Sequence, residues 1–295
     1  MTRYIDEHKD SFGVEPICRI LQVAPSSYYA ARNRPRSARA IRHAERGADI
    51  RRIHAEHFGV YGSRKAWHAL RRVGIAIGRD QVARLMRGLG LAGATRTKRI
   101  RTTRPAPLGQ RPADLVERVF SAPAPNRLWV ADLTYVWTRS GFVYTAFVVD
   151  VFSRAIVGWR VSASLHTELA LDALEMAIWT RRADDLGGLV HHSDRGVQYL
   201  AIRYTERLAE AEAVSSVGSR GDSYDNALAE TVNGLYKAEL INRHGPWRSV
   251  EAVELATAEW VHFWNTRRLH GACGDIPPAE FEAVYHSLRA TTEAA

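Results

Sequence analysis

Three acidic residues occupy sequence contexts that a folded chain can accommodate in few ways. Asp132 lies in a strand-like run whose alternation puts the apolar residues Val130 and Val136 on its own face. Asp194 ends a second apolar run, and Glu230 lies in a helix-like stretch after 35 intervening residues. A carboxylate in an apolar strand is costly to bury unless something compensates its charge. The fold therefore has to supply these carboxylates with partners.

Convergence of the three carboxylates would make a metal site. At about 4 Å and an effective dielectric near 20, each pair repels by about 4 kcal/mol, and a divalent cation removes that penalty. Oxygen ligands suit Mg²⁺ or Mn²⁺, and two such ions roughly 4 Å apart can clamp both reacting oxygens of a phosphodiester. The pattern predicts Asp132, Asp194 and Glu230 as metal ligands and catalytic residues. The alternative is a strand-end aspartate, a turn aspartate and a solvated helical glutamate.

Other polar residues compete for the same role. Asp150 follows an apolar strand and precedes a turn, where structural hydrogen bonding is expected. Asp222 and Asp225 stand where a helix cap or first turn would lie, which explains them without a metal. His191 and His192 alternate to opposite faces of a strand, and we expect them to be structural.

Polar residues continue along one face of the Glu230 helix. Asn226 and Asn233 lie four residues before and three after Glu230, and Lys237 lies seven after it. Seven steps of about 100° return to within about 20° of the same face, about 10 Å further along the axis. This stripe predicts DNA contacts at Asn226, Asn233 and Lys237, with a merely solvated face as the alternative.

Charge divides the chain into two unequal parts. Residues 1–112 hold 24 Lys and Arg against 8 Asp and Glu, whereas residues 113–295 hold 17 against 24. The net charges are therefore +16 and −7, which give the overall +9. A basic part of this size is typical of a phosphate-binding surface, although basic helices are often only solvated. The asymmetry predicts one part that grips DNA and another that cuts it.

The basic part is expected to be helical. Residues 13–31 predict two short helices, and residues 38–58 predict a longer one anchored by Ile41, Ile50 and Ile53. A further helix is expected to begin at Ser63 as its N-cap and to direct Ala66, Leu70 and Val73 inward, and another to span residues 80–89. Predicted phosphate contacts on these helices are Arg64, Lys65, Arg71, Arg72, Arg79, Arg84 and Arg87.

A linker without apolar periodicity follows, from Ala92 to Pro112. Five of its basic residues fall within nine positions with no acid between them, namely Arg96, Lys98, Arg99, Arg101 and Arg104. Such a segment can lie along a phosphate backbone, or it can simply solubilise the chain.

The second part alternates strands and helices. Strands are predicted over residues 128–137, 142–149, 154–161, 188–193 and 213–217, and helices over residues 167–182, 197–211, 223–241 and 250–265. Trp260, Phe263 and Trp264 of the last helix are expected to pack on the core.

Several segments together resemble a known family. They are Trp129 to Tyr135, Val149 to Arg154, His192 to Gly196, Tyr224 to Glu230 and Asn265 to His270. In this order, with 35 residues between Asp194 and Glu230, they resemble the Asp-Asp-Glu core of retroviral integrases and bacterial insertion-sequence transposases. The resemblance is greatest to the second-frame protein of the family called IS-three.

The resemblance implies an α+β or α/β chain with a ribonuclease-H-like core, a mixed five-stranded sheet with flanking helices. It implies an N-terminal helical segment (1–37), a helix-turn-helix-like module (38–91), a basic linker (92–118), the core (119–245) and a helical extension (246–295). The implied activity is Mg²⁺- or Mn²⁺-dependent cleavage and transfer of DNA strands, with two ions in the active complex. Implied partners are double-stranded DNA, further copies of the chain, and the first-frame protein or a frameshift fusion with it.

Two rival functions stay open at this point. One is a metal-dependent nuclease of the same fold, and the other is a DNA-binding regulator with a silent core. The sequence shows no apolar run approaching 18 residues, no signal peptide, and only two distant cysteines, Cys18 and Cys273. We therefore expect no membrane contact and a bacterial cytoplasmic, nucleoid-associated location.

Overall fold

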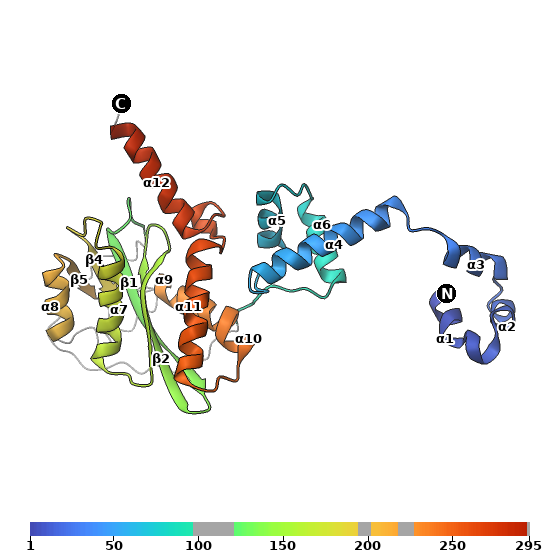
Figure 1. The fold of residues 1–295 in the computed structure, drawn as a ribbon, viewed down its shortest axis with the longest axis horizontal. Coiled ribbons are helices and arrows are strands. Elements are labelled where there is room, and N and C mark those ends of the chain that lie inside the picture. Colours follow the sequence, from blue (N-terminus) through green and yellow to red (C-terminus); the bar gives the residue numbers. More distant parts are fainter. Residues whose placement is uncertain (97–120, 194–201, 218–226, 294–295) are drawn as a thin grey trace. The chain divides into compact units, whose positions relative to one another are not determined.

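The chain forms two compact units. A computed structural model describes residues 1–96, 121–193, 202–217 and 227–293. The units are Met1–Arg51 and Arg52–Ala295, and helix α4 (Ala38–Glu56) crosses from one to the other, which confirms the long helix predicted there (Figure 1). No helix in the described part of the chain combines the length and the apolar character that a membrane span requires.

The first unit is a small helical cluster. It contains α1 (Thr2–Phe12), α2 (Val14–Ile20) and α3 (Pro25–Asn33), and the last two confirm the predicted helical pair. Its core consists of Ile5, Ile17, Cys18 and Tyr28. Local periodicity gives no separate helix over residues 2–12, where Ile5 is the buried residue, although the resemblance implies a helical segment over residues 1–37.

The second unit begins with the end of α4 and a helical pair, α5 (Ser63–Arg72) and α6 (Arg79–Gly88). Ala66 and Leu70 are buried as predicted. Val73 is 52% exposed, so its predicted inward position is wrong, because the helix ends at Arg72 and Val73 is its C-cap residue.

Two further details of these helices differ from expectation. Gly62 is the N-cap of α5 and no side chain caps the helix, so the predicted cap at Ser63 is wrong by one residue. Ile50 and Ile53 are buried, but Ile41 is 47% exposed. Only the second half of α4 therefore carries the predicted apolar anchors.

The centre of the second unit is a mixed five-stranded sheet, as predicted, in the order β3-β2-β1-β4-β5. Its strands are β1 (Leu128–Thr138), β2 (Gly141–Asp150), β3 (Ile156–Ser162), β4 (Val190–Ser193) and β5 (Val214–Val217). β2 pairs with β1 and β3 antiparallel, whereas β4 pairs with β1 and β5 parallel. This arrangement places β1 and β4 side by side at the centre.

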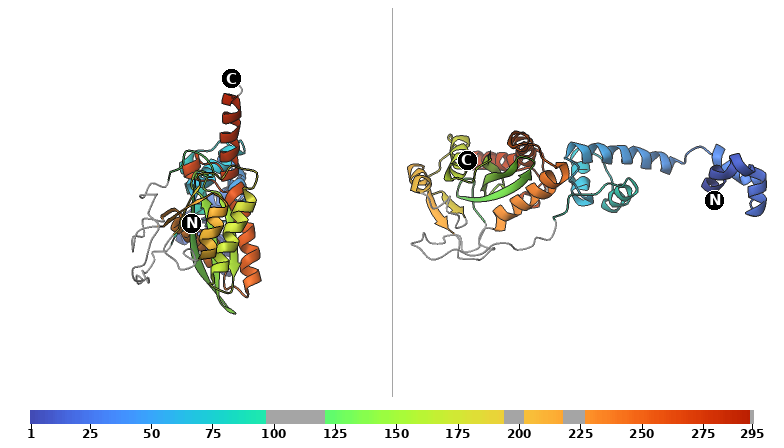
Figure 2. Two further views of the ribbon diagram at one scale, coloured as in Figure 1. Left: turned by 90° about the vertical axis from the view of Figure 1, so that its left-hand side faces the viewer. Right: turned by 90° about the horizontal axis from the view of Figure 1, so that it is seen from below.

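One face of the sheet is covered by α7 (Thr167–Thr180) and α8 (Ile202–Glu210). Trp129 and Ala131 of β1 face these helices and share a core with Leu174. Gly158 of β3 allows a close approach, because a Cβ atom there would lie 2.1 Å from the Ala173 carbonyl oxygen of α7. The views of Figure 2 show helices on both sides of the sheet.

Opposite these helices lies α9 (Ala227–Tyr236), which continues as a π-helical turn, η1 (Lys237–Ile241). The Tyr236 ring lies 5.1 Å from that of Phe147 on β2 and 5.2 Å from that of Trp260, between ring centroids. The described part of the predicted helix 223–241 is thus confirmed, although its last turn is a π-helix. Residues 194–201 and 218–226 lie outside the described ranges.

The C-terminal part contains α10 (Asn242–His244), α11 (Val250–Thr266), the short η2 (Gly271–Cys273) and α12 (Pro278–Glu293). The prediction that Trp260, Phe263 and Trp264 are buried is confirmed. The Tyr61 hydroxyl ties the helical pair to the end of α11, since it accepts the Leu269 N–H at 2.7 Å and donates to the Arg267 carbonyl at 3.3 Å.

Candidate active site

Asp132 lies on β1 and is held from the neighbouring helix α9. Its Oδ2 accepts a hydrogen bond from Asn233 Nδ2 at 2.8 Å, and its Oδ1 accepts the Leu133 backbone N–H at 2.8 Å. The carboxylate is half-buried and Asn233 is buried. Asn233, a member of the predicted polar stripe of α9, therefore faces the predicted catalytic aspartate.

Glu230 stands in the first described turn of the same helix, three residues before Asn233, and is also half-buried. Three residues correspond to about 4.5 Å along a helix axis and to nearly one turn. The bond between Asn233 and Asp132 thus brings the helix of Glu230 onto the strand of Asp132.

Asp194 lies outside the described residues, so its predicted place in the site stays a prediction. The strand before it is described. β4 ends at Ser193, which pairs in parallel with Ala131, the residue before Asp132. In the sequence, Asp132 directly follows Ala131, and Asp194 directly follows Ser193, the partner of Ala131.

Two buried oxygens beside Asp132 have no hydrogen-bond partner among the described residues. They are Oδ1 of Asn233 and Oγ1 of Thr134, which alternation places on the same face of β1 as Asp132. Buried polar atoms are normally satisfied, so unpaired oxygens are a reason to expect a missing ion or water. Carboxylate, amide and hydroxyl oxygens are a donor set that suits Mg²⁺. The described residues, which do not include Asp194, contain no complete group of three metal-ligating side chains.

Lys237 follows on the same helical segment, at the first residue of η1. Its Nζ lies 4.3 Å from the ring centroid of Tyr135, three residues beyond Asp132 on β1. Asn226, the first residue of the predicted stripe, lies outside the described range.

The residues predicted to be structural are confirmed as such where they are described. Asp150 is fully buried and accepts three hydrogen bonds, from the Asn126 N–H, the Ser153 N–H and the Ser153 hydroxyl. Burial raises the pKa of Asp150 above its ordinary value. His191 bonds to the Tyr204 hydroxyl at 3.0 Å, and His192 to Ser216 at 3.0 Å. Asp222 and Asp225 lie outside the described ranges.

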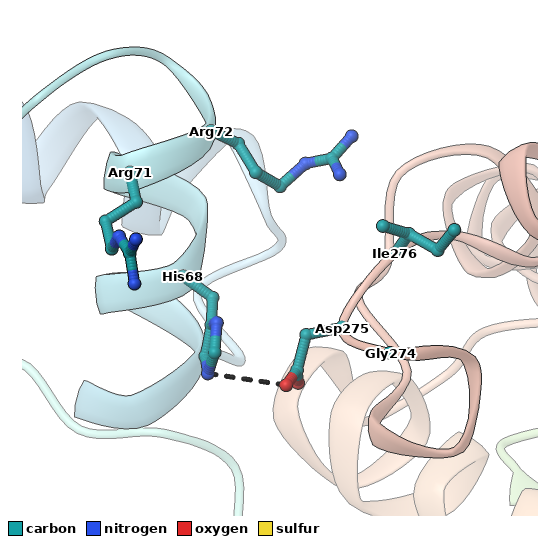
Figure 3. A pocket seen from close by; sticks show the side chains of 6 residues that line it. All are labelled: His68, Arg71, Arg72, Gly274, Asp275 and Ile276. Atoms are coloured by element: carbon teal, nitrogen blue, oxygen red, sulfur yellow. Dashed lines mark ion pairs between the residues drawn. The ribbon is translucent and has the colours of Figure 1, made fainter.

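Ion pairs engage several of the arginines predicted to contact DNA. Arg72 pairs with Glu280 at 2.6 Å, and Arg64 pairs with Asp275 at 3.3 Å. Asp275 also faces His68 at 3.3 Å (Figure 3). The sequence gives no signal for these pairs, because each joins residues more than 200 positions apart. Arg64 and Arg72 are therefore paired with acidic side chains of the same chain, and a DNA phosphate would have to compete with these side chains.

A pocket of about 290 Å³ lies beside these pairs, lined by His68, Arg71, Arg72, Gly274, Asp275 and Ile276 (Figure 3). The Arg71 guanidinium lies over the Trp67 ring at 5.1 Å from its centroid. Arg79 pairs with its neighbour Asp80, and Arg84 and Arg87 are exposed.

Lys65 and Arg96 are the remaining described members of the predicted DNA-binding set. Lys65 lies over the Tyr61 ring, and burial lowers the pKa of Lys65 to about 7, with the nearby charge of Arg268 adding to the effect. Arg96 lies against α9, because a Cβ atom at Gly234 would be 2.7 Å from its Nε. Lys98, Arg99, Arg101 and Arg104 lie outside the described ranges.

Family models match most of the chain. An integrase core domain matches residues 122–223, a second integrase core model matches residues 214–278, and an HTH-like domain matches residues 41–99. The fold and these matches define a DNA strand-transfer enzyme built on an integrase core, a polynucleotidyl transferase.

Curated relatives identify the family. The putative transposase of element IS986/IS6110 from Mycobacterium tuberculosis strain H37Rv is 56% identical over 272 residues, which cover 91% of this chain and 98% of the relative. The transposase of IS629 from Shigella sonnei is 50% identical over 294 residues, 97% of each chain. The chain belongs to the insertion-sequence transposases, and the resemblance to the IS-three family is confirmed.

Solved structures give a more distant match. The catalytic core domain of HTLV-2 integrase in complex with magnesium is 18% identical, with a TM-score of 0.42, and the match covers 54% of this chain and 98% of that one. A simian T-cell lymphotropic virus intasome chain is 14% identical with a TM-score of 0.45, over 79% and 74% of the two chains.

Proposed function

We propose that Asp132, Asp194 and Glu230 form the catalytic site of this transposase and hold two Mg²⁺ or Mn²⁺ ions. The observation that carries the proposal is the hydrogen bond from Asn233 to Asp132, which joins the Glu230 helix to the strand beside β4. The unpaired oxygens of Asn233 and Thr134 support a metal or its water ligands at this place.

Bound ions would supply an activated oxygen nucleophile and stabilise charge on the attacking and leaving oxygens of a phosphodiester. The side chains of the protein have the task of fixing geometry. Asn233 would keep the Asp132 carboxylate oriented through its Nδ2, while its own Oδ1 has no hydrogen-bond partner among the described residues. The same carboxylates would serve two reactions in turn, namely hydrolysis of one strand at the element's end and attack by the exposed 3′-hydroxyl on another strand.

The proposed DNA substrate is double-stranded, with the terminal inverted repeats of the element and a target. Lys237, seven residues after Glu230 on the same helical face, would contact a phosphate of the DNA strand that leads into the site. Exposed arginines of the helical pair, such as Arg84 and Arg87, would add sequence-independent affinity. We propose further that several copies of the chain assemble on DNA, that the chain associates with the first-frame protein, and that it is located on the nucleoid.

Three substitutions test the site, Asp132→Asn, Asp194→Asn and Glu230→Gln. The assay is Mg²⁺-dependent strand transfer by the full chain, on a duplex that ends in the terminal repeat read from the DNA around its gene. We expect each variant to lose about a thousandfold in rate, since losing a metal ligand costs several kcal/mol of transition-state stabilisation. Full activity in any one variant removes that residue from the proposal.

A matched control is Glu259→Gln. Glu259 is an exposed helical glutamate on α11, so its change removes the same charge without touching the site. The control should keep strand transfer within about twofold. Circular dichroism of every variant separates lost chemistry from lost folding.

A further inference from the structure

Three aromatic side chains are exposed at the end of the hairpin that joins β1 to β2. Tyr135, Trp137 and Phe142 are 50%, 66% and 49% exposed. The Phe142 ring meets both others edge to face, with centroids 4.8 Å from Trp137 and 5.7 Å from Tyr135. We call these three residues the hairpin patch. Its rings hold one another in place and leave their outer surfaces to solvent.

The hairpin patch adjoins the candidate active site. Lys237, whose ammonium lies over the Tyr135 ring, belongs to the helical segment that carries Glu230 and Asn233. Tyr135 is three residues from Asp132, which is about 10 Å along a strand and about three phosphates along a DNA strand. The hairpin patch therefore lies within a few nucleotides of any phosphodiester held at Asp132.

Alternation places Tyr135 and Asp132 on opposite faces of β1. The described part of β4 pairs with β1 no further than Ala131, so the edge of β1 beyond that point separates the two side chains. A base that reaches the ring from a backbone held at the carboxylates has to turn around this edge. A base that has left the duplex stack has the freedom to do so.

Local charge favours nucleic acid as the ligand. Residues 133–149 contain Arg139 and no acid, and residues 240–250 contain Arg243 and Arg248 and no acid. The two segments adjoin, because the Arg139 N–H donates to the Trp247 carbonyl at 3.0 Å. The part of the chain around them, residues 113–295, has a net charge of −7. The hairpin patch is thus an aromatic and cationic surface within an acidic domain.

A second copy of the chain fits this surface poorly. In a two-fold symmetric contact the same patch meets itself, so Arg139 and Lys237 would face their own copies and repel. Exposed aromatic rings with neighbouring cations are what proteins use to bind single-stranded nucleic acid, by stacking and by phosphate contact.

We propose that the hairpin patch stacks unpaired DNA bases next to the site of strand cleavage. The proposal rests on the proposed function, because it takes the DNA held at Asp132 as the source of these bases. Stacking tolerates any sequence, so the hairpin patch would stabilise opened DNA ends and leave repeat recognition to other surfaces.

The test is equilibrium binding of the full chain in EDTA to two fluorescent probes, an oligothymidine of about 20 nucleotides and a mixed duplex of the same length. Trp137→Ala should weaken oligothymidine binding about tenfold and change duplex binding less than about twofold. Trp137→Phe should restore most of the affinity, because it restores a ring. The salt dependence should stay unchanged in both variants, because no charge is lost.

The chain offers a matched control in Trp179→Ala. Trp179 is 65% exposed on α7, and the Arg182 guanidinium lies 4.0 Å from its ring centroid, much as Lys237 lies over Tyr135. We expect its loss to leave both probes unaffected. An equal effect of Trp137→Ala and Trp179→Ala would overturn the proposal, since it would mark general surface binding.

Sedimentation of the same variants addresses the rival occupant. If Trp137→Ala changes the mass in solution and leaves oligothymidine binding intact, the hairpin patch is a contact between copies and the proposal is wrong. Binding without metal does not require chemistry. Inactivity of the unaltered chain in strand transfer would therefore count against the proposed function alone, whereas unchanged oligothymidine binding by Trp137→Ala would count against the hairpin patch alone.

Discussion

Asp132 and Asp150 lie on neighbouring antiparallel strands, but the groups that surround the two carboxylates differ. Asp150 is fully buried, and protein donors from Asn126 and Ser153 satisfy both of its oxygens. Asp132 is half-buried, and the carbonyl oxygen of the Asn233 amide that holds it has no hydrogen-bond partner among the residues that the structure describes. The comparison teaches that the partners of a carboxylate, more than its place on a strand, distinguish the structural Asp150 from Asp132, the aspartate proposed to be catalytic.

The largest expected effect on stability is that of Asp150→Ala. The change leaves two buried backbone N–H groups and one buried hydroxyl without their hydrogen-bond acceptor, so we expect a loss of about 3 kcal/mol in the free energy of unfolding. Urea titration followed by tryptophan fluorescence measures it. Asp132→Ala is the paired measurement and should cost about 1 kcal/mol or less. Equal losses for the two variants would break the comparison.

A second prediction concerns the residue that positions Asp132. Asn233→Ala should lower the rate of strand transfer about ten- to a hundredfold, because groups that orient a metal ligand have effects of this size. A raised Mg²⁺ requirement should accompany the loss. Thr231→Ala is the control, since that hydroxyl donates to the Ala227 carbonyl within α9. If Asn233→Ala is as inactive as Asp132→Asn, Asn233 is itself a ligand.

A third prediction extends the comparison to cations whose partners lie within the protein. The double change Asp275→Asn and Glu280→Gln frees Arg64 and Arg72, and should tighten duplex DNA binding about two- to fivefold at low salt. The logarithmic salt dependence should steepen by about 1 to 2. The charge-matched control changes two exposed acids elsewhere, Glu206→Gln and Glu259→Gln. An equal gain there would show a net-charge effect.

The smallest expected effect is at Lys65. In the folded protein the pKa of Lys65 is about 7, below the ordinary value near 10.4, so its positive charge destabilises the folded state. This destabilisation is complete below about pH 7 and decreases progressively from pH 7 to pH 10. Lys65→Met should therefore raise the unfolding temperature by about 2 °C near pH 6 and by less near pH 9. Thermal scans at the two pH values measure this, and a larger gain at the higher pH would contradict it.

Much of the catalytic domain follows from local pattern. Alternation in β1 and helical spacing in α9 place Asp132, Glu230 and Asn233 on elements that the structure joins. The structural roles of Asp150, His191 and His192 also follow, because turn position and strand alternation are local properties. The five strands and their order along the chain are confirmed for the same reason, whereas their order within the sheet depends on long-range pairing and is not predicted by local pattern.

Other features depend on contacts between distant residues and could not be predicted. The pair of Arg72 and Glu280 spans 208 positions, and neither residue differs in sequence from an ordinary exposed charge. Local periodicity does not give the bounds of α12, which lies within the helical extension implied by the resemblance, and the exposure of Val73 depends on where α5 ends. The hairpin patch occupies strand positions that a pattern assigns equally well to a buried face.

The bridging hydroxyl of Tyr61 has a consequence for protein engineering. It binds the backbone on both sides of Arg268, a residue that itself forms a buried pair with Glu239 at 2.6 Å. Chimaeras that exchange the helix-turn-helix-like region between related elements would therefore need Tyr61 and its docking segment to be transplanted together. Transfer of a new DNA specificity to this enzyme would thus require the contact between Tyr61 and residues 267–269 to be transferred with the DNA-binding region.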